Sequence, residues 1–181
     1  MKRSELEHLI RAAGAIAQDA EIVIIGSQAI LGQFPEARGI LSISAEADVF
    51  PLNRPERADV IDGAIGEGSR FHEEFGYYAQ GVGEGTAVLP RGWRERLVKI
   101  ENPNTAGTVG LCLEVCDLAI SKYIAGRPKD LDFTRELAKQ QMTDSKTLLA
   151  RLKETDIKAE EVHEAALARI GRDFGLLQTS Q

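Results

Sequence analysis

Two acidic residues, Glu46 and Asp48, stand one residue apart in a stretch, 45–50, where small or apolar residues alternate with acidic ones. This alternation predicts a β-strand whose two carboxylates share one face, with alternate residues ~6.6 Å apart. Two like charges about 6 Å apart repel by roughly 0.7 kcal/mol in water and by more beside a dry surface. A hard divalent cation bound by the carboxylate oxygens would offset this repulsion and so account for the acidic pair.

Gly26 and Ser27 follow a short β-branched run, 21–25, and precede an apolar segment, 28–31, that predicts a short helix. A glycine–serine turn between a strand and a helix offers backbone N–H groups and a hydroxyl to a phosphate. Together with the acidic pair, it supplies the parts of a metal-assisted phosphoryl or nucleotidyl transfer site. A plain turn and a solvated acidic strand face in an α/β protein remain the alternative explanation.

The segments around these motifs predict an α/β (α+β) fold. Strands are expected over 21–25, 45–50, 77–82, 96–100 and 109–114, with helices over 4–18 and 58–65. From Asp117, which we expect to cap a helix over 118–125, the pattern becomes helical and ends in an amphipathic stretch, 156–177. We therefore predict a mixed-sheet core in residues 1–116 and a helical segment, 117–181, packed on that core.

The composition limits the classes of partner. With 22 basic and 28 acidic residues the net charge is −6, which gives no broad electrostatic footprint for duplex nucleic acid. Cys112 and Cys116, the only cysteines, make no disulfide framework, and their spacing without a second pair argues against a structural zinc site. No apolar run is long enough to cross a bilayer, and the first residues lack a signal-peptide core, so we expect a cytoplasmic protein with no membrane partner.

Other residues capable of chemistry have simpler structural explanations. His72 lacks the second histidine, one helical turn away, that a zinc-protease motif needs, and we expect it in a loop or at a strand edge. The glycine-rich stretch 63–69 has no lysine after its last glycine, so it is predicted to be a loop and not a P-loop.

The motifs I-G-S at 25–27 and E-A-D-V at 46–49 resemble the signature of the nucleotidyltransferase superfamily, which has a DNA polymerase β-like fold. The later runs 117–122 and 125–132 resemble the Lys, Arg and Arg/Lys-Asp segment of abortive-infection-type bacterial nucleotidyltransferases. The layout is also similar to small uncharacterised bacterial nucleotidyltransferase-like proteins. The resemblance covers roughly residues 21–133.

This resemblance implies a Mg2+-dependent transfer of a nucleoside monophosphate from an NTP to an acceptor that the sequence does not name, such as a tRNA or a protein. Glu46 and Asp48 would hold the Mg2+, and the NTP phosphates would meet Gly26 and Ser27. Lys122 would approach the triphosphate or the acceptor as a further catalytic residue. A structural role for this lysine, whose stem would lie along apolar surface with the charge in water, is the alternative.

The sequence also departs from the superfamily pattern. The spacer between Ser27 and Glu46 is 18 residues, longer than usual, and the first acid is glutamate where aspartate is commoner. A third carboxylate is expected on a later strand, with Glu101 and Glu114 as the candidates. The alternative function is therefore a catalytically weak, nucleotidyltransferase-fold binding or regulatory protein, as in a toxin–antitoxin pair, that docks a protein partner through the helical tail.

Overall fold

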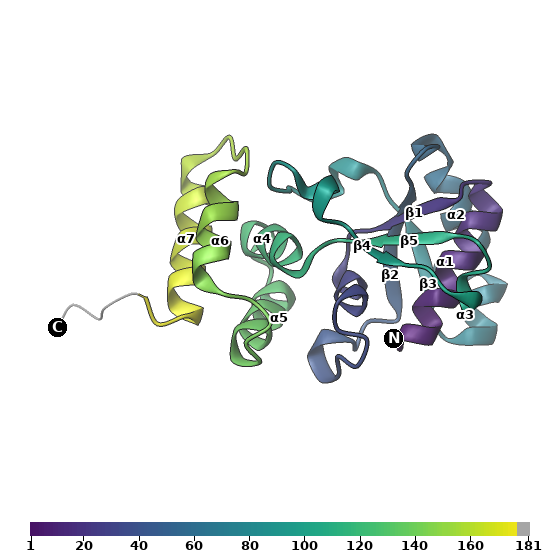
Figure 1. Ribbon diagram of the computed structural model, residues 1–181, viewed down its shortest axis with the longest axis horizontal. Helices are drawn as coiled ribbons and strands as arrows, with labels where there is room; N and C mark the ends of the chain where they lie inside the picture. Colours follow the sequence, from purple (N-terminus) through teal and green to yellow (C-terminus); the bar gives the residue numbers. More distant parts are fainter. Residues whose placement is uncertain (177–181) are drawn as a thin grey trace. The chain divides into compact units, whose positions relative to one another are not determined.

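A five-stranded mixed sheet forms the centre of the N-terminal part of the chain, in the order β3-β2-β1-β5-β4 (Figure 1). The computed structural model describes residues 1–176. β1 pairs antiparallel with β2 and parallel with β5, β2 pairs parallel with β3, and β4 pairs antiparallel with β5. The predicted α/β fold with a mixed sheet is thereby confirmed. The strands are β1 (Glu21–Ile24), β2 (Glu46–Pro51), β3 (Tyr78–Gly81), β4 (Val98–Ile100) and β5 (Val109–Cys112).

Helix α1 (Arg3–Ala17) packs on β1 and β2 with an apolar face. Leu6, Leu9 and Ile10 recur at helical spacing and are at most 1% exposed, so their burial against the sheet holds the helix in place. Helix α2 (Ala58–Ile65) packs on α1 and β3. A third helix, α3 (Arg70–Phe75), follows, and six short 3-10 turns complete the elements before α4: η1 (Ser27–Gly32), η2 (Gly39–Leu41), η3 (Pro55–Arg57), η4 (Glu84–Thr86), η5 (Trp93–Arg96) and η6 (Pro103–Thr105).

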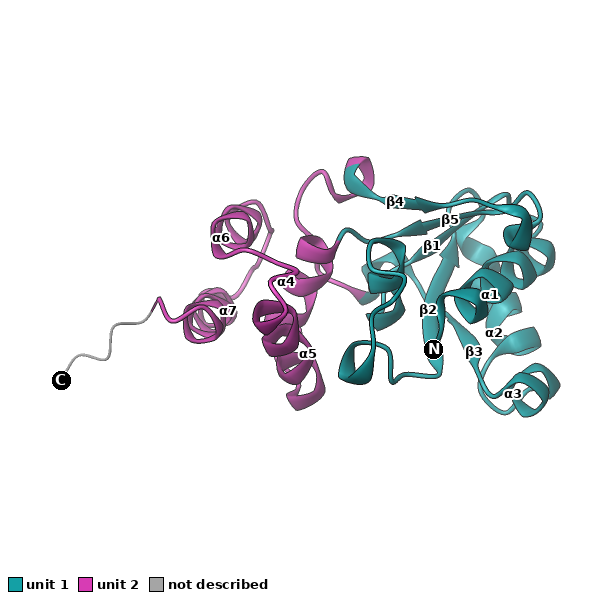
Figure 2. Cartoon of the chain, turned by 60° about the horizontal axis from the view of Figure 1, so that its bottom comes forward, with its two compact units in different colours: residues 1–86, 96–114 teal, residues 87–95, 115–181 magenta. Residues whose placement is uncertain are grey.

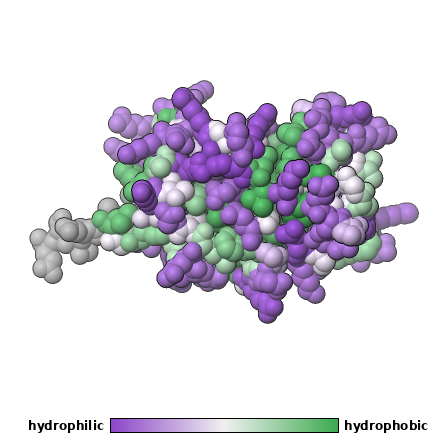
Figure 3. Space-filling model, in the orientation of Figure 1, coloured by the Kyte–Doolittle hydropathy of each residue, from purple (hydrophilic) through white to green (hydrophobic). Residues whose placement is uncertain are grey.

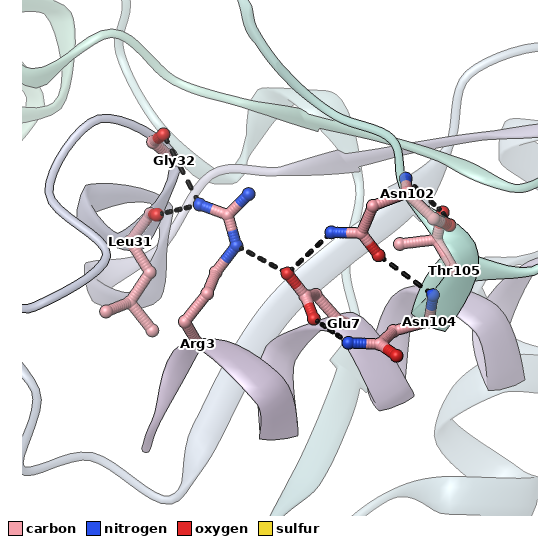
Figure 4. A network of polar contacts seen from close by, with 7 residues as sticks. All are labelled: Arg3, Glu7, Leu31, Gly32, Asn102, Asn104 and Thr105. Carbon is pink, nitrogen blue, oxygen red and sulfur yellow. Dashed lines mark hydrogen bonds and ion pairs between the residues drawn. The ribbon is translucent and has the colours of Figure 1, made fainter.

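A buried carboxylate, that of Glu7, ties α1 to the turn that precedes β5 (Figure 4). Its Oε1 accepts hydrogen bonds from Arg3 Nε at 3.0 Å and Asn102 Nδ2 at 2.8 Å, and its Oε2 accepts one from Asn104 Nδ2 at 2.7 Å. Arg3 also donates to the carbonyl of Leu31, near the end of η1. One acidic side chain therefore fixes α1, η6 and, through Arg3, η1 relative to one another.

The helices of the C-terminal part are α4 (Val115–Ala125), α5 (Pro128–Lys139), α6 (Ser145–Lys153) and α7 (Glu160–Asp173). The chain divides into two compact units, one of residues 1–86 and 96–114 and one of residues 87–95 and 115–181 (Figure 2). Within the second unit, α4 packs against α5, α6 and α7. The predicted division into a mixed-sheet core, 1–116, and a helical segment, 117–181, packed on that core stays a prediction. Leu177, at the end of the predicted amphipathic tail, lies outside the described residues.

Asp117 is not a helix cap, contrary to the sequence-based expectation. Helix α4 begins two residues earlier, at Val115, and places Asp117 in its first turn. The Asp117 side chain is fully buried, with Oδ1 3.4 Å from Arg151 Nε on α6. The ion pair with Arg151 accounts for an acidic residue at this position, which the sequence pattern had assigned to capping. The last helix also begins later than predicted, at Glu160 instead of near Asp156.

His72 lies in helix α3, so its predicted place in a loop or at a strand edge is wrong. Ser69 caps this helix because its hydroxyl accepts a hydrogen bond from the backbone N–H of His72 at 3.2 Å. Gly76 ends the helix in the left-handed conformation, with φ of 75°. The capping serine and the terminal glycine can both be recognised in the sequence, but the helix between them is only six residues long.

Hydrophilic side chains are prominent over both units on the face drawn in Figure 3. Large apolar side chains also reach solvent in places, the most exposed of those described being Ile43 at 80%. None of the described helices is long and apolar enough to cross a membrane.

Candidate functional site

The antiparallel pairing of β1 and β2 brings the two sequence motifs together. Ile24 lies opposite Val49, and the N–H of Ile25 donates to the carbonyl of Asp48 at 3.1 Å. The end of β1 therefore lies beside the start of β2. Gly26 and Ser27, which directly follow Ile25, consequently stand next to the acidic pair despite the long spacer between them.

Asp48 fills the space beside Gly26. A Cβ atom built on Gly26 would lie 1.7 Å from Asp48 Oδ2 and 2.7 Å from its Cγ, far inside contact distance. The φ of Gly26 is −86°, a value that any residue adopts, so its conformation does not require glycine. The glycine is needed for space, because any side chain here would displace the carboxylate.

Glu46 and Asp48 share one face of β2, as the alternating pattern predicts. Both are half-buried, whereas Ala47 and Val49 between and after them are at most 1% exposed on the other face. Because β3 pairs in parallel, with Glu46 opposite Tyr78 and Asp48 opposite Gln80, the polar face continues onto the neighbouring strand. The acids therefore belong to a wider polar surface at the β3 side of the sheet.

Tyr78 contacts the first acid directly. Its hydroxyl donates a hydrogen bond to Glu46 Oε2 at 3.1 Å. Burial, followed by the charge of Glu46 and this hydrogen bond, raises the pKa of Tyr78 to about 12, so the phenol stays protonated at neutral pH. The sequence did not reveal this contact, because the only local signal was a tyrosine in an expected strand and the pairing with Glu46 is not local.

His72 lies on the other side of Tyr78. The two ring centroids are 4.6 Å apart with a tilt of 49°, and the His72 Nδ1 accepts a hydrogen bond from the N–H of Gly68 at 3.1 Å. This acceptor role assigns the proton of the neutral ring to Nε2. Tyr78 therefore lies in contact with both His72 and Glu46.

Gln28, immediately after Ser27 in η1, carries an unsatisfied amide. The residue is fully buried, and neither Oε1 nor Nε2 has a hydrogen-bond partner. Burying an amide without hydrogen-bond partners lowers the stability of the fold. Gln28, beside the predicted phosphate-binding turn, is a residue that the sequence analysis did not single out. The available signal was a single glutamine within an apolar segment, 28–31.

The two candidates for a third acid lie at opposite ends of the sheet. Glu114 follows β5, parallel to β1, and the N–H of Leu113 before it donates to the carbonyl of Ile24 at 3.1 Å. Glu114 is therefore at the end of the sheet that carries Gly26. Glu101 follows the antiparallel β4, and so lies at the far end. Among residues 1–176, however, no three His, Cys, Asp or Glu side chains gather closely enough to hold a metal ion.

Lys122 lies in the helical unit, where it forms a buried ion pair. It is 7% exposed, its Nζ is 3.1 Å from Asp130 Oδ1, and it lies 4.5 Å from the centre of the Phe133 ring. Arg127 Nε contacts the other oxygen of Asp130 at 2.6 Å. Burial pushes the pKa of Asp130 upward, but the Arg127 hydrogen bond and the charge of Lys122 outweigh it and hold the pKa below its usual value. The predicted role of Lys122 toward a triphosphate stays a prediction.

The acidic pair fits a Mg2+ ion that shares its coordination sphere with a substrate. Magnesium in phosphoryl-transfer sites is typically held by one or two carboxylates, with phosphate oxygens and waters completing six ligands. Glu46 and Asp48 supply such a pair of carboxylates on one strand face. Because Gly26 has no side chain, the Asp48 carboxylate has space beside it. A site built entirely from protein ligands is not what this donor set offers.

A family model described as a nucleotidyltransferase of unknown function, DUF6036, matches residues 4–171. The chain belongs to this family. The match spans every strand and most of the helical unit, and the description supports the nucleotidyltransferase superfamily that the two motifs indicate. No curated protein and no solved structure matches this DUF6036 chain.

Proposed function

We propose that this DUF6036 protein is a Mg2+-dependent enzyme that transfers a nucleoside monophosphate from an NTP to an acceptor. The observation that carries the proposal is the packing of Asp48 against Gly26, a contact that only the antiparallel register of β1 and β2 creates. Membership of a family described as nucleotidyltransferases supports the same reaction class.

In this reaction Glu46 and Asp48 hold the cation, and Gly26 and Ser27 contact the phosphates of the NTP. The bound Mg2+ supplies positive charge that stabilises the phosphates and the departing pyrophosphate. An acceptor hydroxyl forms a bond to the α-phosphorus as the bond from that phosphorus to the bridging oxygen breaks. One carboxylate of the pair, or a third carboxylate, accepts the proton that the hydroxyl loses as the new bond forms.

The resemblance to abortive-infection-type enzymes extends the proposal to the acceptor, which would be a tRNA or a protein. The same resemblance assigns Lys122, Arg127 and Asp130 to one functional segment. Their mutual ion pairs within the helical unit support the view that these residues act together. In this proposal the net positive charge of the three residues favours an anionic group.

The test is transfer of label from each α-labelled NTP, with Mg2+, to RNA or protein from a cell extract. We expect the wild type to label one class of acceptor, and Asp48→Asn and Glu46→Gln to reduce the rate by about 100-fold or more, as for loss of a group that stabilises developing charge. Asp59→Asn, which removes an exposed acid from α2, is the matched control and should label normally. Equal rates for Asp48→Asn and the control would exclude catalysis at this site.

A second candidate is the binding or regulatory protein of a toxin–antitoxin pair. It is favoured by the observation that, in the described part of the chain, no third His, Cys, Asp or Glu side chain joins Glu46 and Asp48. In that case the protein binds an NTP with Mg2+, forms a stable complex with a protein partner, and transfers no label under any condition. Calorimetry, co-purification and the transfer assay on the same preparation distinguish the two functions.

A further inference from the structure

Glu46 reaches the polar face of the sheet through a longer side chain than Asp48. Asp48 has only two side-chain torsions and lies against the backbone of Gly26, so its carboxylate has little freedom. Glu46 has one more rotatable bond, which must be ordered before both acids can bind one ion. A glutamate in this position therefore benefits from a neighbour that fixes its carboxylate.

Tyr78 is placed to do this by the pairing of β2 and β3. It is the direct register partner of Glu46, and its hydroxyl donates to Oε2 at 3.1 Å. This contact restrains one oxygen of Glu46 and leaves Oε1 to bind a cation. Carboxylates that bind metal ions are commonly oriented by such second hydrogen bonds, and their loss typically costs 10–100-fold in metal affinity or activity.

The Tyr78 ring is itself restrained by α3. His72 lies against it with ring centroids 4.6 Å apart, and the His72 ring is fixed by the N–H of Gly68. The cap formed by Ser69 on the N–H of His72 holds the backbone of the same residue. A continuous series of contacts therefore runs from the start of α3 through Tyr78 to the carboxylate of Glu46.

We propose that Tyr78, braced by His72, is a positioning residue that orients Glu46 for binding a divalent cation. This inference rests on the proposed function, because it concerns the same acidic pair. It explains how a glutamate can serve where the superfamily commonly has an aspartate: the additional methylene is compensated by a hydrogen bond from the neighbouring strand.

The test is the affinity of the protein for Mn2+, measured by electron paramagnetic resonance with and without a non-hydrolysable NTP analogue. We expect Tyr78→Phe to weaken Mn2+ binding by about 10–100-fold. His72→Leu should weaken it less, because the Tyr78 hydroxyl remains. In the transfer assay, Tyr78→Phe should raise the Mg2+ concentration needed for half-maximal rate while the rate at saturating Mg2+ falls much less.

Tyr77→Phe is the matched control. Tyr77 also loses a hydrogen bond in this variant, because its hydroxyl lies 2.8 Å from His8 Nδ1, but it is not in register with Glu46. We expect Mn2+ affinity to be unchanged, and thermal unfolding of both variants shows whether either substitution acts through the fold.

The outcomes separate this inference from the proposed function. If the wild type binds Mn2+ and transfers label while Tyr78→Phe binds Mn2+ equally well, the positioning role is excluded and the proposed function stands. If Glu46→Gln and Asp48→Asn bind Mn2+ as well as the wild type, the ion is not at this pair and both proposals fall. A loss in Tyr78→Phe that Tyr77→Phe does not share supports the inference.

Discussion

The carboxylate of Asp48 lies against the Cα atom of Gly26, in the space that a side chain at position 26 would occupy. A Cβ on Gly26 would come within 1.7 Å of Asp48 Oδ2. Gly26 follows β1 and Asp48 lies in β2, the antiparallel neighbour of β1, so the contact depends on the register of these two strands. It joins the two motifs of the candidate site into one structural unit.

Gly26→Ala is therefore expected to displace the Asp48 carboxylate, so that Asp48 no longer binds the cation. We predict a loss of transfer rate of about 100-fold or more, similar to that of Asp48→Asn. The measurement is labelled NTP transfer alongside thermal unfolding.

Gly63→Ala provides the control for this substitution. Gly63 lies in helix α2, and a Cβ there would meet no heavy atom within 4 Å. Alanine in a helix is favoured over glycine by roughly 0.5–1 kcal/mol, so this variant should be slightly more stable and fully active. Undiminished transfer by Gly26→Ala would show that the Asp48 position is not required.

Glu7→Gln should destabilise the N-terminal unit in a pH-dependent way. Burial raises the pKa of Glu7, but hydrogen bonds from Asn104, Asn102 and Arg3 outweigh it, so the net pKa is lowered. A lowered folded-state pKa contributes stability that is present above the unfolded-state pKa and is lost as pH falls through the folded-state pKa. We expect the variant to lose about 2 kcal/mol at pH 7, and the difference from wild type to shrink in acid.

Urea unfolding between pH 7 and pH 3 measures this effect. Glu36→Gln is the control, because Glu36 is 86% exposed in its side chain and its ion pair with Arg38 is at the surface. A pH-independent difference between Glu7→Gln and wild type would contradict the assigned pKa direction.

Replacing Lys122 should lower the free energy of unfolding, because a buried carboxylate then loses one of its two cationic partners. Lys122→Met leaves Asp130, with a side chain only 2% exposed, with Arg127 alone, and breaking such pairs commonly costs about 3–5 kcal/mol. The double variant Lys122→Met/Asp130→Asn should lose less than the sum of the single variants, because no uncompensated charge remains. Strict additivity in denaturant unfolding would show that the two side chains do not interact.

Gln28→Met should raise the stability of the protein by about 1 kcal/mol, since replacing a buried, unpaired amide by an apolar group of similar shape removes its desolvation cost. The midpoint of thermal unfolding measures the change. A lower midpoint would mean that water or another group satisfies the amide in solution, and would contradict its unpaired state.

Several local assignments failed for an identifiable reason. Asp117 looks like a capping residue in the sequence, but its side chain pairs with Arg151, 34 residues later in the chain. His72 gave no helical periodicity because α3 has fewer than two turns. Residue propensity and spacing depend on neighbours along the chain. They do not predict a contact with a residue that only folding brings close.

The sequence by itself determined the strand around Glu46 and Asp48, the shared face of these two acids, the amphipathic first helix and the superfamily, because each follows from residue types at fixed local spacing. Tertiary structure alone decided that Asp48 lies on Gly26, that Tyr78 bonds Glu46, and that Glu114, not Glu101, lies at that end of the sheet. These relationships depend on which strands pair, in which direction and in which register. That choice is made by hydrogen bonds and packing between segments far apart in the chain.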